Sequence, residues 1–147
     1  MKIELLQAID EEFEMCAEAF GGPVEEEEVR EAEDDLQIKL PHDYKMFLLK
    51  YGSGAVGEVI VLGLKEAEFV ATPSFVEQSL KFRKNLPESY EKFTVIGIDG
   101  AGNPIGFNLP NTEIIRFHID LGEQEVIVNS FEEYLEKALK EEINIHF

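Results

Sequence analysis

The sequence predicts a single α+β domain spanning residues 1–147, with a largely antiparallel sheet flanked by N-terminal and C-terminal helices. Three observations support this fold class. Apolar residues recur at helical spacing in the first third of the chain, short β-branched and aromatic runs separated by turn residues occupy residues 93–128, and a capped amphipathic segment follows. A chain of this length with 44% hydrophobic residues can bury one complete core.

Three helices are predicted in the first third of the chain. The first runs over residues 2–20, where apolar residues follow the 3.6-residue period until Gly21-Gly22 provides a stop. The second covers residues 25–36 and begins with an acidic run, which the helix macrodipole favours. The third begins at Pro41, a residue suited to a first helical position, and ends at Gly52.

A strand and a fourth helix are predicted in the middle of the chain. Residues 58–62 form a short β-branched run between two glycines, which is typical of a buried strand. Thr72 and Pro73 then resemble an N-cap and the first residue of a helix. We therefore expect a helix that extends from there toward Leu86.

Four consecutive strands and a last helix are predicted after Pro87. Turn residues separate the strands, which favours short connections and antiparallel neighbours. The strands cover residues 93–98, 105–109, 113–119 and 125–128. Ser130 followed by Glu133 forms a capping box, and an amphipathic pattern continues from it as the C-terminal helix.

The chain is strongly acidic, with a formal net charge of −18 and a pI near 4.4. Residues 1–35 hold fourteen acidic and two basic residues, which gives −12, and the remainder holds seventeen against eleven, which gives −6. Such a field repels the phosphates of nucleic acids and anionic lipids, so we expect no nucleic acid and no membrane as partner, and a basic partner fits better. The charge also has a plain explanation in solubility, and composition alone does not decide between the two.

The cysteine content and the N-terminal sequence favour a cytoplasmic protein. Cys16 is the single cysteine, so no intramolecular disulfide can form. It falls on the apolar side of the first predicted helix, where we expect a small buried thiol. The first residues interleave acidic and apolar positions, which suits neither a signal peptide nor a membrane span of about 20 apolar residues.

Motifs of catalysis, cofactor binding and metal binding are weak or out of context. Residues 52–57, GSGAVG, match a dinucleotide fingerprint, but they follow a helix and precede a strand, so we expect a helix cap and a flexible turn. The turn at residues 99–103 offers too few oxygen ligands for calcium. His42, His118 and His146 are isolated from one another, and no nucleophile elbow is present. We therefore predict no enzyme, no cofactor and no metal.

Three stretches have the order and spacing of a known family. Residues 29–54 read VREAEDDLQIKLPHDYKMFLLKYGSG, residues 96–105 read IGIDGAGNPI, and residues 130–135 read SFEEYL. Together they resemble the SUKH superfamily, which includes yeast cell-wall-synthesis regulators and many bacterial immunity proteins. The first stretch matches through hydrophobic anchors and turn residues: Leu36, Leu40, Pro41, Tyr44, Phe47, Leu48, Tyr51 and Gly52. The resemblance implies an α+β domain with a curved, largely antiparallel sheet.

The resemblance implies a binding protein and not an enzyme. Bacterial members resemble cytoplasmic immunity proteins that block a toxin, often a secreted toxin with a nuclease domain. An acidic inhibitor can occupy the basic cleft in which such a nuclease holds its polyanionic substrate. Two alternatives stay open: a regulatory scaffold or adaptor for cellular proteins, as the yeast relatives suggest, and an enzyme or small-ligand binder that uses the glycine-bordered sheet as a pocket.

Exposed acidic residues are the predicted contacts with the protein partner. The second helix turns its apolar residues inward, which leaves its acidic residues on the opposite side. Acidic side chains at exposed turns can also attract a basic partner. The predicted partner-binding residues are Glu27, Glu31, Asp34 and Asp35 on the second helix, with Asp99 and Asp120 at exposed turns.

Overall fold

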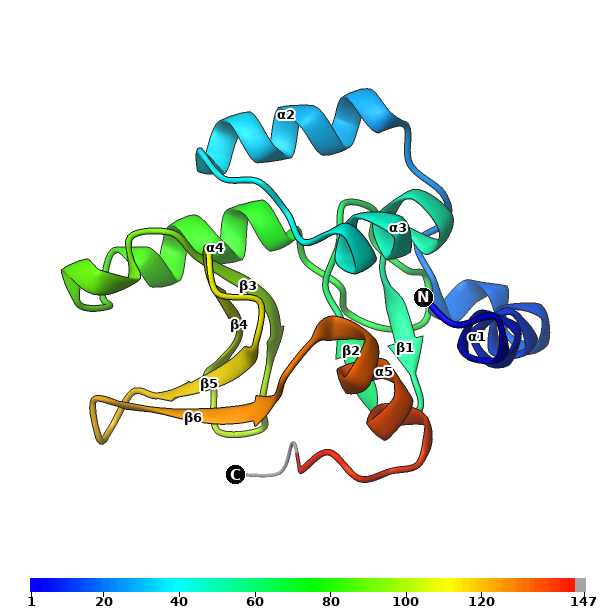
Figure 1. Ribbon diagram of the computed structural model, residues 1–147. Helices are drawn as coiled ribbons and strands as arrows, with labels where there is room; N and C mark the ends of the chain where they lie inside the picture. Colours follow the sequence, from blue (N-terminus) through cyan, green and yellow to red (C-terminus); the bar gives the residue numbers. More distant parts are fainter. Residues whose placement is uncertain (145–147) are drawn as a thin grey trace.

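The computed structural model describes residues 1–144, so His146 lies outside the described residues. The N-terminal half is mainly helical and the C-terminal half holds the larger sheet (Figure 1). The helices are α1 (Ile3–Met15), α2 (Glu26–Leu36), α3 (His42–Tyr51), α4 (Phe75–Arg83) and α5 (Phe131–Leu139), with single 3₁₀ turns η1 (Ala17–Ala19) and η2 (Glu88–Tyr90). The strands are β1 (Gly54–Val56), β2 (Val59–Val61), β3 (Phe93–Ile98), β4 (Pro104–Asn108), β5 (Ile114–His118) and β6 (Glu123–Val128).

The larger sheet is antiparallel throughout, in the order β3-β4-β5-β6, and it curves around the core (Figure 1). β1 and β2 form a separate two-stranded antiparallel sheet. A hydrogen bond from the Leu62 amide to the Ile96 carbonyl, 2.8 Å, joins the end of β2 to β3. The predicted α+β class with antiparallel sheets between N-terminal and C-terminal helices is therefore confirmed.

The two faces of the larger sheet pack against different helices. On one face Phe107 lies 5.9 Å from Tyr44 of α3 and 6.4 Å from Phe131 of α5, measured between ring centroids. The buried Tyr44 hydroxyl donates to the Leu62 carbonyl at 2.7 Å, so its polar atom is satisfied inside the core. On the opposite face Phe117 lies 5.0 Å from Tyr90 of η2.

The outer edge of β3 forms hydrogen bonds with α4. The Val95 amide donates to the Ser79 hydroxyl at 2.8 Å, and the Arg83 guanidinium donates to the Phe93 carbonyl at 2.8 Å. Backbone groups that would otherwise lack a strand partner are thereby satisfied. At the other edge, β6 pairs with β5 and with no further strand of residues 1–144.

The first helix is shorter than predicted, because it ends at Met15 and not near Phe20. Cys16 leaves helical geometry, and Phe20 adopts an extended conformation that pairs with Gly54 in an isolated bridge. This path places the Phe20 ring against the Tyr51 ring, with 5.8 Å between the ring centroids. The expectation of a buried Cys16 thiol is also wrong, since the residue is only partly buried.

Helix α4 ends at Arg83 and not near Leu86, and β6 begins at Glu123 and not at residue 125. Two assignments also differ from the prediction. Residues 54–56 were expected as a flexible turn, but they pair with Val59–Val61 as strand β1. The N-cap of α4 is Ser74, whose hydroxyl accepts from the Val76 amide. Thr72, the predicted cap, is buried instead and its hydroxyl accepts from the Ala67 amide at 2.7 Å. The Thr72 hydroxyl is therefore used inside the protein and does not cap the helix.

Candidate partner-binding site

Four of the predicted acidic contacts lie on the solvent side of α2. Glu27, Glu31, Asp34 and Asp35 are all exposed, whereas the helix buries its apolar residues against the core. The amphipathic pattern thus placed these side chains correctly on the outer face. None of the four forms a salt bridge with a residue of the described chain.

The charge density of α2 is high and little compensated. Its eleven residues include seven acidic residues and a single basic one, Arg30. Three of the acids stand in the first turn, where the helix macrodipole stabilises negative charge. The remaining acids extend along the helix, so like charges repel one another at spacings of three and four residues. A cationic surface that approached this side would relieve that repulsion.

Glu33 is an acid of α2 that has a structural role. Its side chain is buried, and one carboxylate oxygen accepts a hydrogen bond from the Leu40 amide at 2.8 Å. The other oxygen lies 4.0 Å from the Lys45 ammonium. Glu33 therefore fixes the connection between α2 and α3. Its position on the inner side of the helix, next to Ala32 and Leu36, was the sequence signal for this role.

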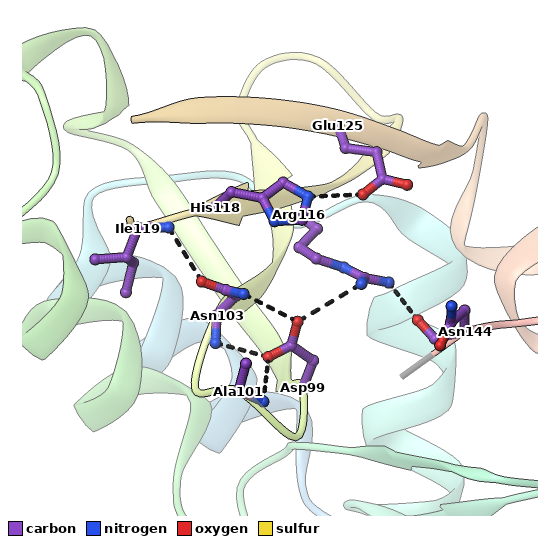
Figure 2. A network of polar contacts seen from close by, with 8 residues as sticks. All are labelled: Asp99, Ala101, Asn103, Arg116, His118, Ile119, Glu125 and Asn144. Atoms are coloured by element: carbon purple, nitrogen blue, oxygen red, sulfur yellow. Dashed lines mark hydrogen bonds and ion pairs between the residues drawn. The ribbon is translucent and has the colours of Figure 1, made fainter. Parts of the chain in front are cut away.

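Asp99 is not at an exposed turn, and this part of the prediction is wrong. The residue is 6% exposed, and its carboxylate is directed into the protein (Figure 2). One carboxylate oxygen accepts from the amides of Ala101 and Asn103 at 3.0 and 2.8 Å. The other accepts from the Asn103 side chain at 3.2 Å. Asp99 thus organises the β3–β4 turn from within, and its carboxylate is not available at the surface.

Arg116 is the internal counter-charge of Asp99. A guanidinium nitrogen lies 3.6 Å from the second Asp99 oxygen, with both side chains buried. The guanidinium also donates to the Asn144 carbonyl, so it connects β5 to the C-terminal segment (Figure 2). The sequence prediction missed Arg116, although an arginine inside the apolar run IIRF is itself a signal for a buried carboxylate partner.

The β5–β6 hairpin continues this polar network toward the surface. The Asn103 side-chain oxygen accepts from the Ile119 amide at 3.0 Å, which ties the β3–β4 turn to the end of β5. His118 and Glu125 lie 2.8 Å apart across the two strands. These contacts fix the start of the hairpin connection. Asp120 stands just beyond them and is exposed, as predicted.

The structure does not bring Asp120 together with the acids of α2. In Figure 1 α2 lies at one end of the molecule, and the tip of the β5–β6 hairpin lies well away from it, beyond α4. The predicted partner-binding residues that are exposed therefore divide into a group on α2 and a single residue, Asp120, on the hairpin. A partner that contacts both must cover a large part of this surface.

The GSGAVG segment is part of a helix cap and a strand and does not have the geometry of a dinucleotide-binding loop. Gly52 caps α3 with a φ of 76°, and the following residues enter β1, so no helix N-terminus follows GSGAVG to hold a phosphate. Among residues 1–144 no group of three His, Cys, Asp or Glu side chains is placed to hold a metal ion. No helix in that range is long and apolar enough to cross a membrane.

Comparison with known proteins identifies the family. No curated protein matches the chain significantly. The family model of the SMI1/KNR4 family (SUKH-1) matches residues 23–137, which include every helix and strand from α2 to β6 and most of α5. Helix α1 lies outside the match. The matched region holds most of the chain, and this protein belongs to the SMI1/KNR4 family (SUKH-1).

Proposed function

We propose that this chain is a cytoplasmic immunity protein that binds and neutralises a cognate bacterial toxin. Membership of the SMI1/KNR4 family (SUKH-1) supports a role of this type. The observation that carries the proposal is the solvent face of α2, whose exposed acids lie inside the family match and have no salt-bridge partner in residues 1–144. The protein acts as a stoichiometric inhibitor, without catalysis and without a cofactor.

A basic nuclease domain is the partner that this surface fits. A nuclease must attract a polyanionic substrate, so its cleft carries positive charge. The solvent face of α2 presents Glu27, Glu31, Asp34 and Asp35 as a row of carboxylates, which imitates a phosphate backbone in charge. Occupation of the cleft by these side chains excludes the nucleic acid.

The acidic face of α2 contributes mainly to the rate of association. Complementary charge raises association rate constants from roughly 10⁵–10⁶ M⁻¹s⁻¹ toward about 10⁸–10⁹ M⁻¹s⁻¹ at low salt. Exposed charge pairs add little to affinity, because water screens them. Tight binding requires apolar or aromatic side chains that become buried at the contact. The acidic face therefore needs a second, apolar contact region on this protein.

Rescue from toxicity is the experiment that tests this function. The test uses the C-terminal domain of a candidate toxin whose gene is adjacent to the gene for this chain. This domain is expressed from an inducible promoter, together with this chain or with an empty vector. We expect growth with the chain and growth arrest without it. Equal killing in both cultures contradicts the proposed function.

A regulatory scaffold or adaptor for cellular proteins is the second candidate, because family membership fits it as well. A pull-down from cells that lack the toxin distinguishes the two functions. A stable set of cellular proteins on the bait, together with no rescue, favours the scaffold. An empty bait together with rescue favours the immunity protein.

A further inference from the structure

The β5–β6 hairpin exposes three large apolar side chains that are close together in the sequence. Ile119 is 49% exposed, Leu121 is 69% exposed and Val126 is 47% exposed. All three lie within eight positions of the chain, at the tip of the hairpin and on its outer strand. Gathered apolar exposure of this kind marks interaction surfaces more often than scattered single residues do.

The strand register places Phe117 and Val126 on one face of the sheet. Phe117 pairs with Gln124 and Ile115 pairs with Val126, so Phe117, Gln124 and Val126 point to the same side of the sheet. Tyr90 covers part of this side, because its ring lies 5.0 Å from Phe117 and its hydroxyl donates to the Gln124 side chain at 2.7 Å. Tyr90 thus covers Phe117 and Gln124, whereas Val126, two residues further along β6, is exposed to solvent.

An apolar hollow lies next to Phe117 and Ile119. It has a volume of about 400 Å³ and opens between the end of α4 and the hairpin. Pockets that bind small molecules span roughly 300–1,000 Å³, so this volume accommodates a large apolar side chain. Its apolar lining consists of Phe82, Leu86, Pro87, Phe117 and Ile119.

The charge around the hairpin indicates the chemistry of the occupant. Asp120, Glu123 and Glu125 give the hairpin three negative charges, and the sequence contains no Lys or Arg between Arg116 and Lys137. Glu125 lies against His118, whereas Asp120 and Glu123 form no salt bridge within residues 1–144. Lys81 lies on the opposite wall, so the acidic character belongs to the hairpin side of the hollow.

We infer that this hairpin surface, made of the hollow and of Ile119, Leu121 and Val126, seats a large apolar side chain of a basic protein toxin. Lys or Arg residues that flank this side chain lie against Asp120 and Glu123. The inference rests on the proposed function and supplies the apolar contact that the acidic face of α2 lacks. In this view the acids of α2 speed up association with the toxin, and the hairpin surface slows dissociation of the complex.

A second copy of this chain is a poorer occupant of the surface. A symmetric contact through the hairpin would bring Asp120 and Glu123 of each copy toward the same residues of the other. Like charges placed together at a contact are destabilising, and they select against that partner. A basic partner has no such penalty. The chain by itself is therefore expected to be monomeric.

Titration of matched variants against the purified toxin domain from the adjacent gene tests the inference. The test variant carries Ile119→Ser and Leu121→Ser. The control carries Ile60→Ser and Phe69→Ser, which remove side chains of similar exposure, 42% and 66%, from other surfaces. All four sites are exposed, and an unchanged unfolding midpoint verifies that each variant folds. A third variant, Val126→Arg, places a positive charge on the same surface.

We expect the test variant to raise the Kd at least about tenfold, through faster dissociation, with an association rate constant like that of the unmodified chain. Val126→Arg should weaken binding as well, and the control should stay within about twofold. Unchanged affinity of the test variant overturns the inference and leaves the proposed function intact. A dimer of the free chain that the test variant abolishes also overturns it. Absence of any complex with the unmodified chain overturns the proposed function, and the inference with it.

Discussion

The Asp99 carboxylate lies 3.6 Å from the Arg116 guanidinium, and both side chains are almost completely buried. The pair joins the β3–β4 turn to β5, and the contact of Arg116 with the Asn144 carbonyl extends it to the C-terminal segment. A buried charge is stable only when it is paired and hydrogen-bonded. Each charge of this pair therefore depends on the other, and neither side chain is exposed on the surface.

Replacement of Asp99 by alanine is expected to destabilise the protein strongly. Asp99→Ala leaves Arg116 buried without its carboxylate and removes the acceptor of the Ala101 and Asn103 amides, so we expect a loss of about 3–5 kcal/mol in the free energy of unfolding. Asp120→Ala, the same change at the exposed neighbouring turn, should alter stability by less than about 0.5 kcal/mol. Urea unfolding measures both. Equal stability of the two variants would show that the buried pair contributes nothing.

Replacement of Gly52 by alanine tests close backbone packing at the end of α3. A Cβ atom at this position would lie 2.0 Å from the Gly22 carbonyl oxygen, and φ is 76°. Gly102 has a similar φ of 88° with no atom within 4 Å of a built Cβ, so Gly102→Ala isolates the conformational cost of about 1–3 kcal/mol. We expect Gly52→Ala to destabilise the protein by clearly more than Gly102→Ala in thermal or urea unfolding. Equal losses would rule out the steric contribution.

Tyr51 is expected to make stability fall at alkaline pH. Burial raises the pKa of its phenol above the ordinary value of 10, and the 2.6 Å hydrogen bond from its hydroxyl to Asp10 raises the pKa further. The folded state then holds the proton more tightly than the unfolded chain, so this contribution is complete below about pH 10 and is lost as the pH rises through the folded-state pKa.

Tyr51→Phe removes the phenol, so the variant should lose less stability than the unmodified protein between about pH 9 and pH 11. At neutral pH the same variant should cost about 1 kcal/mol, because Asp10 loses its hydrogen bond. Unfolding midpoints in urea across this pH range measure both effects. An identical alkaline slope in the two proteins would remove Tyr51 as a cause.

The acids of α2 are expected to govern how fast the toxin associates. A variant with all four acids neutralised should associate about tenfold more slowly at low salt and with a weaker salt dependence. It carries Glu27→Gln, Glu31→Gln, Asp34→Asn and Asp35→Asn. The matched control neutralises four exposed acids on and just after α1, outside the family match: Glu4, Glu11, Glu14 and Glu18, each to Gln. Stopped-flow measurements at several salt concentrations compare the two. Equal slowing would mean that net charge matters and the position on α2 does not.

The helices and strands were largely predictable, because hydrophobic spacing and turn residues are local signals. The capping box at Ser130 is a clear case, since its hydroxyl accepts from the Glu133 amide at 3.1 Å. Phe20 and Thr72 were assigned wrongly, because contacts with residues distant in the sequence decide their geometry. Phe20 packs on Tyr51, and the hydroxyl of Thr72 lies 3.3 Å from that of Ser53.

The candidate site was predictable only where periodicity determines exposure. Helical spacing fixes the outward direction of Glu27 and Glu31 on α2. The burial of Asp99 depends on Arg116, which lies on a different strand, and a turn sequence by itself gives no indication of that partner. The hollow beside Ile119 forms between α4 and β5, so it too requires the tertiary structure.

Inhibition of the purified toxin domain tests the central claim most directly. Its nuclease activity is measured while this chain is titrated in, and the mixture is then resolved by size. We expect the activity to fall linearly and to end near an equimolar ratio, together with a single complex of the two chains. Full activity in the presence of excess chain, with no complex, would contradict it.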